Sequence, residues 1–262
     1  VVAGDSAPIP MGMGGFGSRQ TITAGSSAHI AAIEVRQKAL RIAAHMLEAS
    51  EEDLEIEGSE IRVKGVPDMS VSLSKIAHAV AGTPGYALPA GISPGLESTQ
   101  NFLTDPLAYC YGCHVVEVEV DVETGGVAFR NYAIVHDSGT LINPMIVLGQ
   151  IQGGAAHGVG NALFEWMGYD DDANPVTTNF GEYLLPTAPE MPNFDIQFLE
   201  SPSPLNPLGV KGAGEGSTVP AAAAVISAVE DALKPFGVHI AEAPITPARI
   251  VALIAEAKGK AA

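Results

Sequence analysis

A single glutamate flanked by glycines is the residue in this sequence best placed for acid–base chemistry. Glu215 lies in the segment Lys211–Gly216, which reads KGAGEG and leads into an apolar, alanine-rich stretch. A carboxyl group withdrawn from water there would have a raised pKa, in the range that a general base needs. The alternative is an exposed glutamate near a helix N-terminus, where the helix dipole favours a negative charge.

A glycine-rich loop near the N-terminus could bind a phosphate group. The segment Gly12–Gly17 reads GMGGFG and has GxGxxG spacing, with Glu34 at about the distance expected of a dinucleotide-binding unit. Such a unit needs an apolar strand directly before its first glycine, but Pro8 and Pro10 occupy that position, which disfavours a nicotinamide fold. The loop and Arg19 suit a phosphate or pyrophosphate beside a helix N-terminus. A structural turn with an exposed arginine is the alternative.

Amide and hydroxyl side chains gather in a third segment. Asp137–Thr140 reads DSGT, Asn143 and Pro144 follow, and Gly149–Gly154 reads GQIQGG. Amide side chains beside glycines can recognise the edge of a heterocycle by hydrogen bonds. Capping of a helix by Asn143 explains part of the pattern without a ligand.

The cysteines and histidines do not form a recognisable metal or redox motif. Cys110 and Cys113 are the only cysteines, too few for a disulfide framework and compatible with a reducing compartment. They lead into an alternating strand, whereas a redox pair usually begins a helix and a zinc site needs two further ligands. We therefore expect thiols that simply pack. We interpret His114, His136 and His157 as packed or surface residues.

Composition excludes several classes of partner. The 262 residues are 47% hydrophobic, enough for one large core or two smaller ones. Thirty acidic against 13 basic residues give a net charge of -17, which argues against nucleic acid and anionic membranes as partners. No stretch approaches the roughly 20 apolar residues of a membrane span, and we expect a cytoplasmic location.

The periodicity of apolar residues predicts both helices and strands. A long helix over 28–49 is expected to be capped by Ser26 and Ser27. A second long helix should begin after Asn143 and carry four glycines, which implies close packing or a ligand. Thr83–Gly95 is a candidate connection between two lobes. Further helices are predicted at 73–80, 219–233 and 247–258, and strands at 54–57, 61–64, 115–121, 127–135 and 194–200.

In this order and spacing, the segments resemble the large molybdenum-binding subunit of the xanthine dehydrogenase and aerobic carbon monoxide dehydrogenase family. The resemblance rests on GMGGFGSRQT with Ala24–Ala28, GCHVVEVEVDVETG, HDSGTLINPMIVLGQIQGG and SPSPLNPLGVKGAGE. It covers nearly the whole chain but corresponds to the C-terminal part of that subunit. It implies that residues 1–262 form a C-terminal molybdopterin-binding region with an α+β fold, in which mixed sheets and long helices make two lobes.

The resemblance also implies residue roles. Glu215 matches the catalytic base of the family's KGxGE motif, close to molybdenum, in a hydroxylation whose oxygen comes from water. The protein itself would supply no metal ligand. Ser138 stands where the carbon monoxide dehydrogenase branch often has cysteine, so the contact there must differ. The implied cofactor-binding residues are Gly17, Ser18, Arg19, Gln20, Thr21, Ser138, Gln150, Ala213 and Gly214.

The resemblance implies partners because the N-terminal half of the family's molybdenum subunit is absent from these residues. We expect a molybdenum–molybdopterin cytosine dinucleotide cofactor shared with that half as a separate chain, and no activity without it. An iron–sulfur subunit with two clusters and usually an FAD subunit would accept the electrons. The implied substrate is an N-heterocycle, a purine-like compound or an aldehyde. A carbon monoxide dehydrogenase-type subunit and a non-catalytic cofactor-binding or assembly protein of the same fold are the alternatives.

Overall fold

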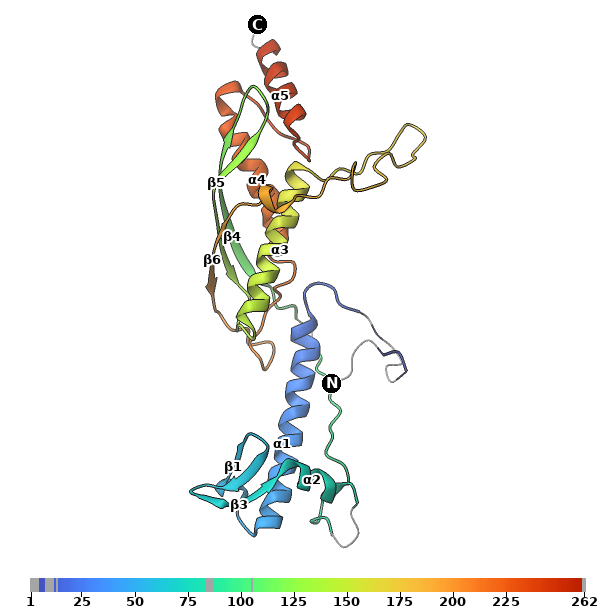
Figure 1. Cartoon of the computed structure of the whole chain (residues 1–262), viewed down its shortest axis with the longest axis vertical. Coiled ribbons are helices and arrows are strands. Elements are labelled where there is room, and N and C mark those ends of the chain that lie inside the picture. The colour runs from blue at the N-terminus through green and yellow to red at the C-terminus, as the bar shows by residue number, and fades with distance from the viewer. Residues whose placement is uncertain (1–4, 8–11, 13, 83–86, 105, 261–262) are drawn as a thin grey trace. The chain divides into compact units, whose positions relative to one another are not determined.

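The chain forms two compact units, each of which is described by itself (Figure 1). The computed structural model describes residues 5–7, 12, 14–82, 87–104 and 106–260. The first unit comprises Val1–Met11 and Thr23–Thr104, and the second comprises Gly12–Ile22 and Asp105–Ala262. The described part of the predicted connection, residues 87–95, belongs to the first unit, and the division follows Thr104.

The first unit is a small sheet packed against a long helix. Helix α1 spans Ser26–Leu47, a 3-10 turn spans Glu51–Asp53, and α2 spans Leu73–Val80. The sheet has the order β1-β2-β3, with strands Leu54–Glu57, Glu60–Val63 and Val66–Ser72, all antiparallel. The predicted hairpin and short helix are confirmed. The hydrophobic core of the first unit consists of Ala39, Leu40, Ile42, Ala43, Leu54, Ile61, Val71, Ile76 and Val80.

The predicted cap of the first helix is wrong. A π-helical turn, Thr21–Gly25, already precedes α1, so Gly25 is the N-cap residue and the two serines lie inside the first turn. The Ser27 hydroxyl donates to the Thr23 carbonyl at 2.9 Å and accepts from the Phe102 N–H at 2.9 Å. Ser27 therefore stabilises the turn and a neighbouring loop instead of starting the helix.

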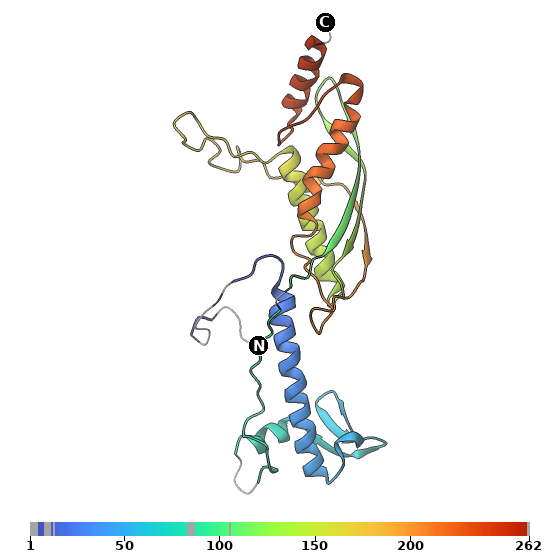
Figure 2. The same cartoon turned by 180° about the vertical axis from the view of Figure 1, so that it is seen from behind.

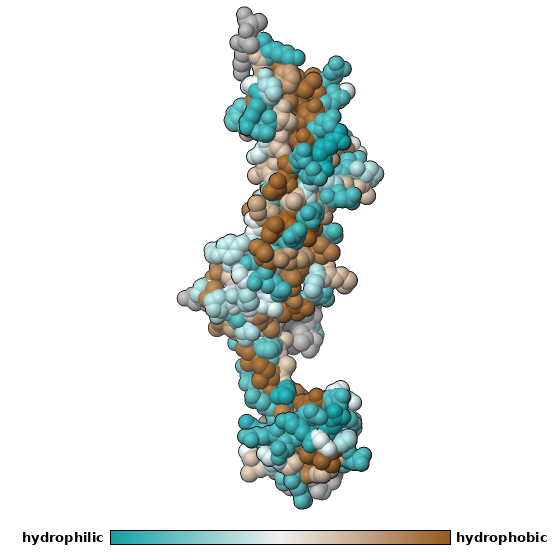
Figure 3. All heavy atoms as spheres, turned by 90° about the vertical axis from the view of Figure 1, so that its left-hand side faces the viewer, coloured by the Kyte–Doolittle hydropathy of each residue, from teal (hydrophilic) through white to brown (hydrophobic). Residues whose placement is uncertain are grey.

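The second unit is built on a mixed sheet of order β4-β5-β6. Strands Tyr111–Val120 and Val127–Asp137 pair antiparallel, and Phe194–Leu199 adds to β5 in parallel. In the connecting turn the Asp121 carboxylate accepts from the Glu123 and Thr124 N–H groups. The predicted hairpin and third strand are confirmed. The outer face carries both apolar and acidic side chains, and Figure 3, which views this side, shows apolar patches among hydrophilic residues.

Two helices cover the inner face of this sheet, as Figures 1 and 2 show. They are α3, Pro144–Leu163, and α4, Thr218–Ala232, while α5, Pro247–Lys260, follows a 3-10 turn at Lys234–Phe236. Another 3-10 turn spans Ala188–Glu190. The core consists of Tyr132, Ile134, Ile151, Ala155, Val159, Ala162, Leu163, Val225, Val229, Leu233, Val238, Ile240, Ile245, Ile250 and Ile254. This is the α+β fold that was expected.

Glycines on α3 determine how closely α4 approaches. A Cβ atom added at Gly158 would lie 2.2 Å from the Ala221 Cβ, and one at Gly154 would lie 2.9 Å from the Ser217 Cβ. The side of α3 that bears Gly153 is open, because no described atom lies within 4 Å of a Cβ placed there. Close packing therefore explains part of the glycine pattern, and it brings the segment before α4 next to α3. In the described residues, no helix has both the length and the apolar character to cross a membrane.

Candidate cofactor site

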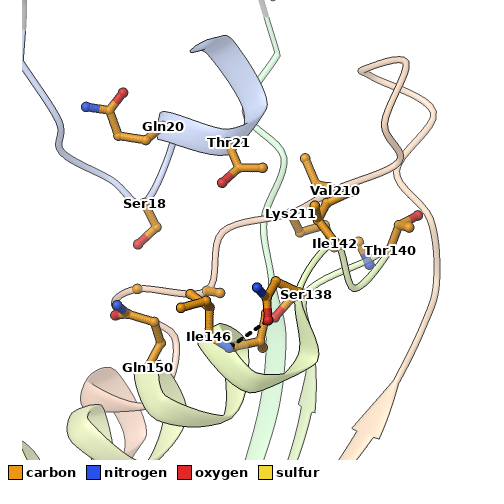
Figure 4. A pocket seen from close by; sticks show the side chains of 14 residues that line it. Ser18, Gln20, Thr21, Ser138, Thr140, Ile142, Ile146, Gln150, Val210 and Lys211 are labelled. Carbon is orange, nitrogen blue, oxygen red and sulfur yellow. Dashed lines mark hydrogen bonds between the residues drawn. The ribbon is translucent and has the colours of Figure 1, made fainter. Parts of the chain in front are cut away.

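A pocket of about 390 Å³ lies in the second unit where three segments distant in sequence meet (Figure 4). These segments are the loop before α1, the β5–α3 connection with the first turns of α3, and the loop before α4. The predicted residues that line the pocket are Ser18, Gln20, Thr21, Ser138, Gln150, Ala213 and Gly214. Gly17 and Arg19 are not among the lining residues, and the Arg19 guanidinium lies 4.3 Å from the centre of the Phe16 ring.

Ser18 joins the first and last of these segments through Glu215. Its hydroxyl donates to Oε2 of Glu215 at 2.9 Å and accepts from the Glu215 N–H at 2.9 Å. Added Cβ atoms at Gly212 and Gly214 would lie 2.9 Å from the Ser18 Cβ and 3.3 Å from its Oγ. The glycines of the KGAGEG segment therefore allow its backbone to approach Ser18 closely.

The expected burial of Glu215 is wrong for this chain by itself. Glu215 and Gly214 are both exposed, in the turn that leads into α4. The Glu215 carbonyl accepts from the N–H groups of Thr218 and Val219 at 3.1 and 3.3 Å, so the carboxylate stands at the helix N-terminus. The chain alone thus fits the alternative of an exposed glutamate.

A buried ion pair fixes the start of the same loop. The Lys211 ammonium group lies 3.1 Å from Oδ2 of Asp137 and 2.6 Å from Oγ of Ser201, and the two charged side chains are only 8% and 10% exposed. Burial raises the pKa of the Asp137 carboxyl, but the hydrogen bonds that it accepts outweigh this effect and lower the pKa to about 2. The Asp137 carboxylate is therefore charged, and its contact with Lys211 ties the loop to the end of β5.

The residues on either side of Asp137 are buried without such partners. Within the described residues, neither ring nitrogen of His136 nor the hydroxyl of Ser138 has a hydrogen-bond partner. Burial lowers the pKa of His136, which keeps the ring neutral at physiological pH. A Cβ atom at Gly216 would lie 2.4 Å from the His136 ring and 2.8 Å from the Cys110 sulfur. Only glycine therefore fits next to Glu215 on this side.

The remaining histidines and the cysteines follow the expectations in part. His114 bonds to the Tyr132 hydroxyl at 2.9 Å, and burial, with a contribution from His136, lowers its pKa to about 4. His136 is buried, His114 is partly buried and His157 is exposed, so the interpretation of the three histidines as packed or surface residues is confirmed. Cys110 is half-buried, but Cys113 is exposed on β4, so the expectation of packed thiols fails for Cys113. The described residues contain no group of three or more ligating side chains that could hold a metal ion.

Sequence reasoning missed the apolar wall of the pocket. Ile142, Ile146, Val147 and Val210 line it together with Thr140 and Asn143. The available signal was helical spacing, because Ile146 and Val147 lie four and three positions before Gln150 on α3. Asn143 was expected as part of the amide-rich segment and as a helix cap, and it does cap α3 by accepting from the Ile146 N–H at 3.2 Å.

The pocket suits a ligand that is rich in hydrogen-bonding groups. Hydroxyl and amide side chains line one part, apolar side chains line another, and glycine leaves backbone accessible. The buried Ser138 hydroxyl, which has no partner in the described part of the chain, favours a ligand atom or a water at that position. An organic cofactor with a polar ring edge and phosphate groups fits this set of side chains.

Known proteins resemble the chain along most of its length. A family described as molybdopterin cofactor-binding domain matches residues 1–192. The large subunit of nicotine 6-hydroxylase from Paenarthrobacter nicotinovorans is 42% identical over 251 residues, which is 96% of this chain and 31% of that protein. The carbon monoxide dehydrogenase large chain of Hydrogenophaga pseudoflava is 36% identical over 250 residues, 95% of this chain and 31% of that one. The xanthine dehydrogenase molybdenum-binding subunit of Escherichia coli O157:H7 is 34% identical over 248 residues, which is 94% of this chain and 32% of that protein.

A solved structure confirms the fold. Quinoline 2-oxidoreductase from Pseudomonas putida 86 has a TM-score of 0.83 and 40% identity, and the match covers 94% of this chain and 31% of that one. The chain thus spans about a third of the length of the curated relatives it matches. It belongs to the molybdopterin cofactor-binding domain family and is homologous to part of the molybdenum-binding large subunits of the carbon monoxide and xanthine dehydrogenase family.

Proposed function

We propose that this chain forms one wall of the cofactor site of a molybdenum hydroxylase and supplies its general base, Glu215. The observation that carries the proposal is the pair of hydrogen bonds between Ser18 and Glu215 at the edge of the pocket. It joins two motifs 197 positions apart in the sequence, so the glycine-rich N-terminal loop and the KGAGEG segment meet at one place. The family membership supports the same cofactor.

The residues around the pocket would divide the work of binding. Ser18, Gln20 and Thr21 offer hydrogen bonds to the phosphate groups of a molybdopterin cytosine dinucleotide. Ser138 and Gln150 would contact the cofactor at the opposite side of the pocket, and Ala213 and Gly214 would present backbone to the pterin. Gly17 and Arg19 lie just outside and would hold the loop. When bound, the cofactor supplies a molybdenum centre that accepts two electrons from the substrate.

Glu215 would act through the oxygen that Ser18 leaves available. Ser18 binds Oε2, so we assign to Oε1 the removal of the proton from the water-derived oxygen that is transferred to the substrate. In the chain alone the carboxylate is exposed. Covering it by the cofactor and a further protein wall would withdraw it from water and make it a stronger base.

The missing wall implies partners. About two-thirds of each curated relative lies outside the matched region. We propose that protein similar to this unmatched part of the molybdenum subunit closes the site. An iron–sulfur subunit and an FAD subunit would carry the electrons away, as the resemblance to the molybdenum hydroxylases implies.

An N-heterocycle is the substrate class that the comparisons favour. The relatives named for nicotine and for quinoline are 42% and 40% identical to this chain, against 36% for the carbon monoxide dehydrogenase chain. Ser138 also stands where the carbon monoxide branch often has cysteine. We therefore rank a nicotine- or quinoline-like ring above carbon monoxide, a purine or an aldehyde.

The substitution Glu215→Gln in the purified native complex tests the proposal. Loss of the base should lower kcat roughly 100- to 10,000-fold with the substrate that the wild-type complex oxidises. Molybdenum and pterin contents should stay at the wild-type level, because the amide keeps the shape of the side chain. The matched control is Glu119→Gln, which changes an exposed glutamate on β4 and should leave kcat unchanged. An unchanged kcat in Glu215→Gln would contradict the assignment of the base and would favour a non-catalytic role for this chain.

A further inference from the structure

An arm of residues 164–187 extends from the C-terminal end of α3, away from the sheet and α4 (Figures 1 and 2). It contains neither a helix nor a strand, yet its own backbone holds it in shape. The Asp170 N–H donates to the Asn174 carbonyl at 3.0 Å, and the Val176 N–H donates to the Gly168 carbonyl at 2.9 Å. These bonds make the outer part of the arm a narrow hairpin whose conformation does not depend on a ligand.

The base of the arm is fastened to α3. The Tyr183 hydroxyl donates to Oε2 of Glu165 at 2.6 Å, and the Glu165 N–H donates to the Gly160 carbonyl at 2.8 Å. The buried hydroxyl of Thr177 accepts from the Gly168 N–H at 2.6 Å. The arm is therefore ordered before any partner binds, which lowers the entropic cost of an interface there.

The side chains that this ordered arm presents are unusually apolar for a surface. The exposed fraction is 80% for Phe180, 62% for Tyr169 and 53% for Trp166. The large apolar residues of the arm that are exposed are Trp166, Met167, Tyr169, Val176, Phe180, Leu184 and Leu185. An exposed cluster of this kind usually marks an interaction site, and aromatic side chains with methionine are typical of interface cores.

Charge limits what can cover the arm. Asp170, Asp171 and Asp172 form an acidic turn at its tip. A second copy of this chain would bring the same acidic turn and a further net charge of -17 into contact with the first. A different partner with an apolar groove and basic residues at the rim fits better.

We propose that the arm docks into the part of the molybdenum subunit that the relatives possess and that the described chain does not contain. This inference rests on the proposed function, because it identifies the companion as the remainder of that subunit. The match spans only 31% of each relative, so most of the surface that could cover these side chains lies in the unmatched part.

Site-specific photocross-linking in the native complex tests the assignment. With p-benzoylphenylalanine at position 180, mass spectrometry should identify a cross-linked peptide from sequence similar to the unmatched N-terminal region of the relatives, in a separate chain or the same polypeptide. The same group at position 123, in the exposed turn between β4 and β5, is the control and should not give this peptide. A cross-link to a second copy of this chain, or to an iron–sulfur or flavin protein, would overturn the proposal.

A substitution series measures how much the arm contributes to binding. Phe180→Ser should weaken the attachment of the arm at least 10-fold, measured as retention of the companion if it is a separate chain and as resistance of the arm to limited proteolysis if it is the same polypeptide, because exposed aromatic anchors dominate such interfaces. Val122→Ser, which changes an exposed apolar residue outside the arm, should leave retention unchanged. Equal retention in Phe180→Ser and the wild type would overturn the proposal. Molybdenum analysis of the same preparations separates the two hypotheses: a companion without molybdenum contradicts the proposed function alone, and molybdenum with an arm that contributes nothing contradicts this inference alone.

Discussion

Three consecutive buried residues at the end of β5, His136 to Ser138, differ in whether their polar side-chain atoms have hydrogen-bond partners. The Asp137 carboxylate accepts hydrogen bonds from Ser201 and the Gly139 N–H, and it pairs with Lys211. His136 and Ser138 are just as buried, yet their side-chain polar atoms have no partner in the described part of the chain. The difference indicates two roles: Asp137 fixes the loop that carries the glutamate, whereas His136 packs against that loop and Ser138 lines the pocket.

Strand geometry explains the contrast. Successive side chains of a strand point to opposite sides, so Asp137 points away from its two neighbours. On its side lie Lys211 and Ser201. On the other side the His136 ring abuts Gly216 and Ser138 lines the pocket. A hydrogen-bonded charge and two unpartnered polar groups therefore stand within three residues of each other, next to the loop that carries Glu215.

The largest expected effect on stability comes from replacing Asp137, the residue whose side chain has hydrogen-bond partners. Asp137→Ala leaves the Lys211 charge buried without its partner and should lower the free energy of unfolding by about 3–5 kcal/mol. Urea unfolding of the full chain measures it. The control is Lys234→Met, which removes a surface pair with Asp231 whose side chains are more than 60% exposed, and it should cost under about 1 kcal/mol. A cost for Asp137→Ala as small as the control would show that the pair does not hold the loop.

His114 and Asp137 should lose their contributions to stability in two separate pH ranges. Burial lowers the pKa of His114 to about 4, so the unfolded chain takes up this proton first and stability falls as the pH drops from about 6.5 to 4. Asp137, with a pKa of about 2, contributes stability above pH 4 that is lost between pH 4 and 2. The step for His114 should amount to about 3 kcal/mol and the step for Asp137 to about 2 kcal/mol in the free energy of unfolding.

His114→Gln sharpens this test, because it should make the upper step smaller, leaving the part that comes from His136, and should leave the lower step unchanged. The measurement is urea unfolding of both proteins at intervals from pH 8 to pH 2, wherever unfolding stays reversible. An upper step of equal size in His114→Gln would show that another group is responsible.

The smallest effect on stability is expected at Ser138. Its hydroxyl has no partner to lose, so Ser138→Ala should leave the free energy of unfolding unchanged or raise it by about 1 kcal/mol. In the native complex the same substitution should lower the molybdenum and pterin content, because a hydrogen bond to the cofactor is missing. A loss of more than about 1 kcal/mol in the chain alone would mean that the hydroxyl already has a partner within the protein.

Local patterns allowed much of the fold to be predicted. The alternation in β4 and β5, the turn between them and the cap at Asn143 all depend on neighbours in sequence, and all are confirmed. Strand β3 was missed because only Val71 among its residues is buried, so the strand has no alternating pattern. The cap of α1 was wrong because the π-helical turn before it leaves no mark in residue types.

The site could be predicted only as separate motifs. Residue types pointed to Glu215 and to the amide-rich segment with Gln150, and the family resemblance added Ser18, but nothing local shows that they meet. The pairing of Lys211 with Asp137 joins residues 74 positions apart, and the exposure of Glu215 depends on what surrounds the loop in space. Long-range contacts of this kind depend on the packing of α3 against α4, and therefore on glycines whose neighbours the sequence does not identify.

We propose above all that the pocket between Ser18 and Gln150 holds a molybdopterin cofactor. Its most direct test is metal and nucleotide analysis of the complex purified from its native cells. We predict molybdenum and pterin in amounts equimolar with this chain, a cytidine nucleotide released on acid hydrolysis, and a clear reduction of both in Ser138→Ala. An intact complex that contains neither molybdenum nor pterin would contradict the account.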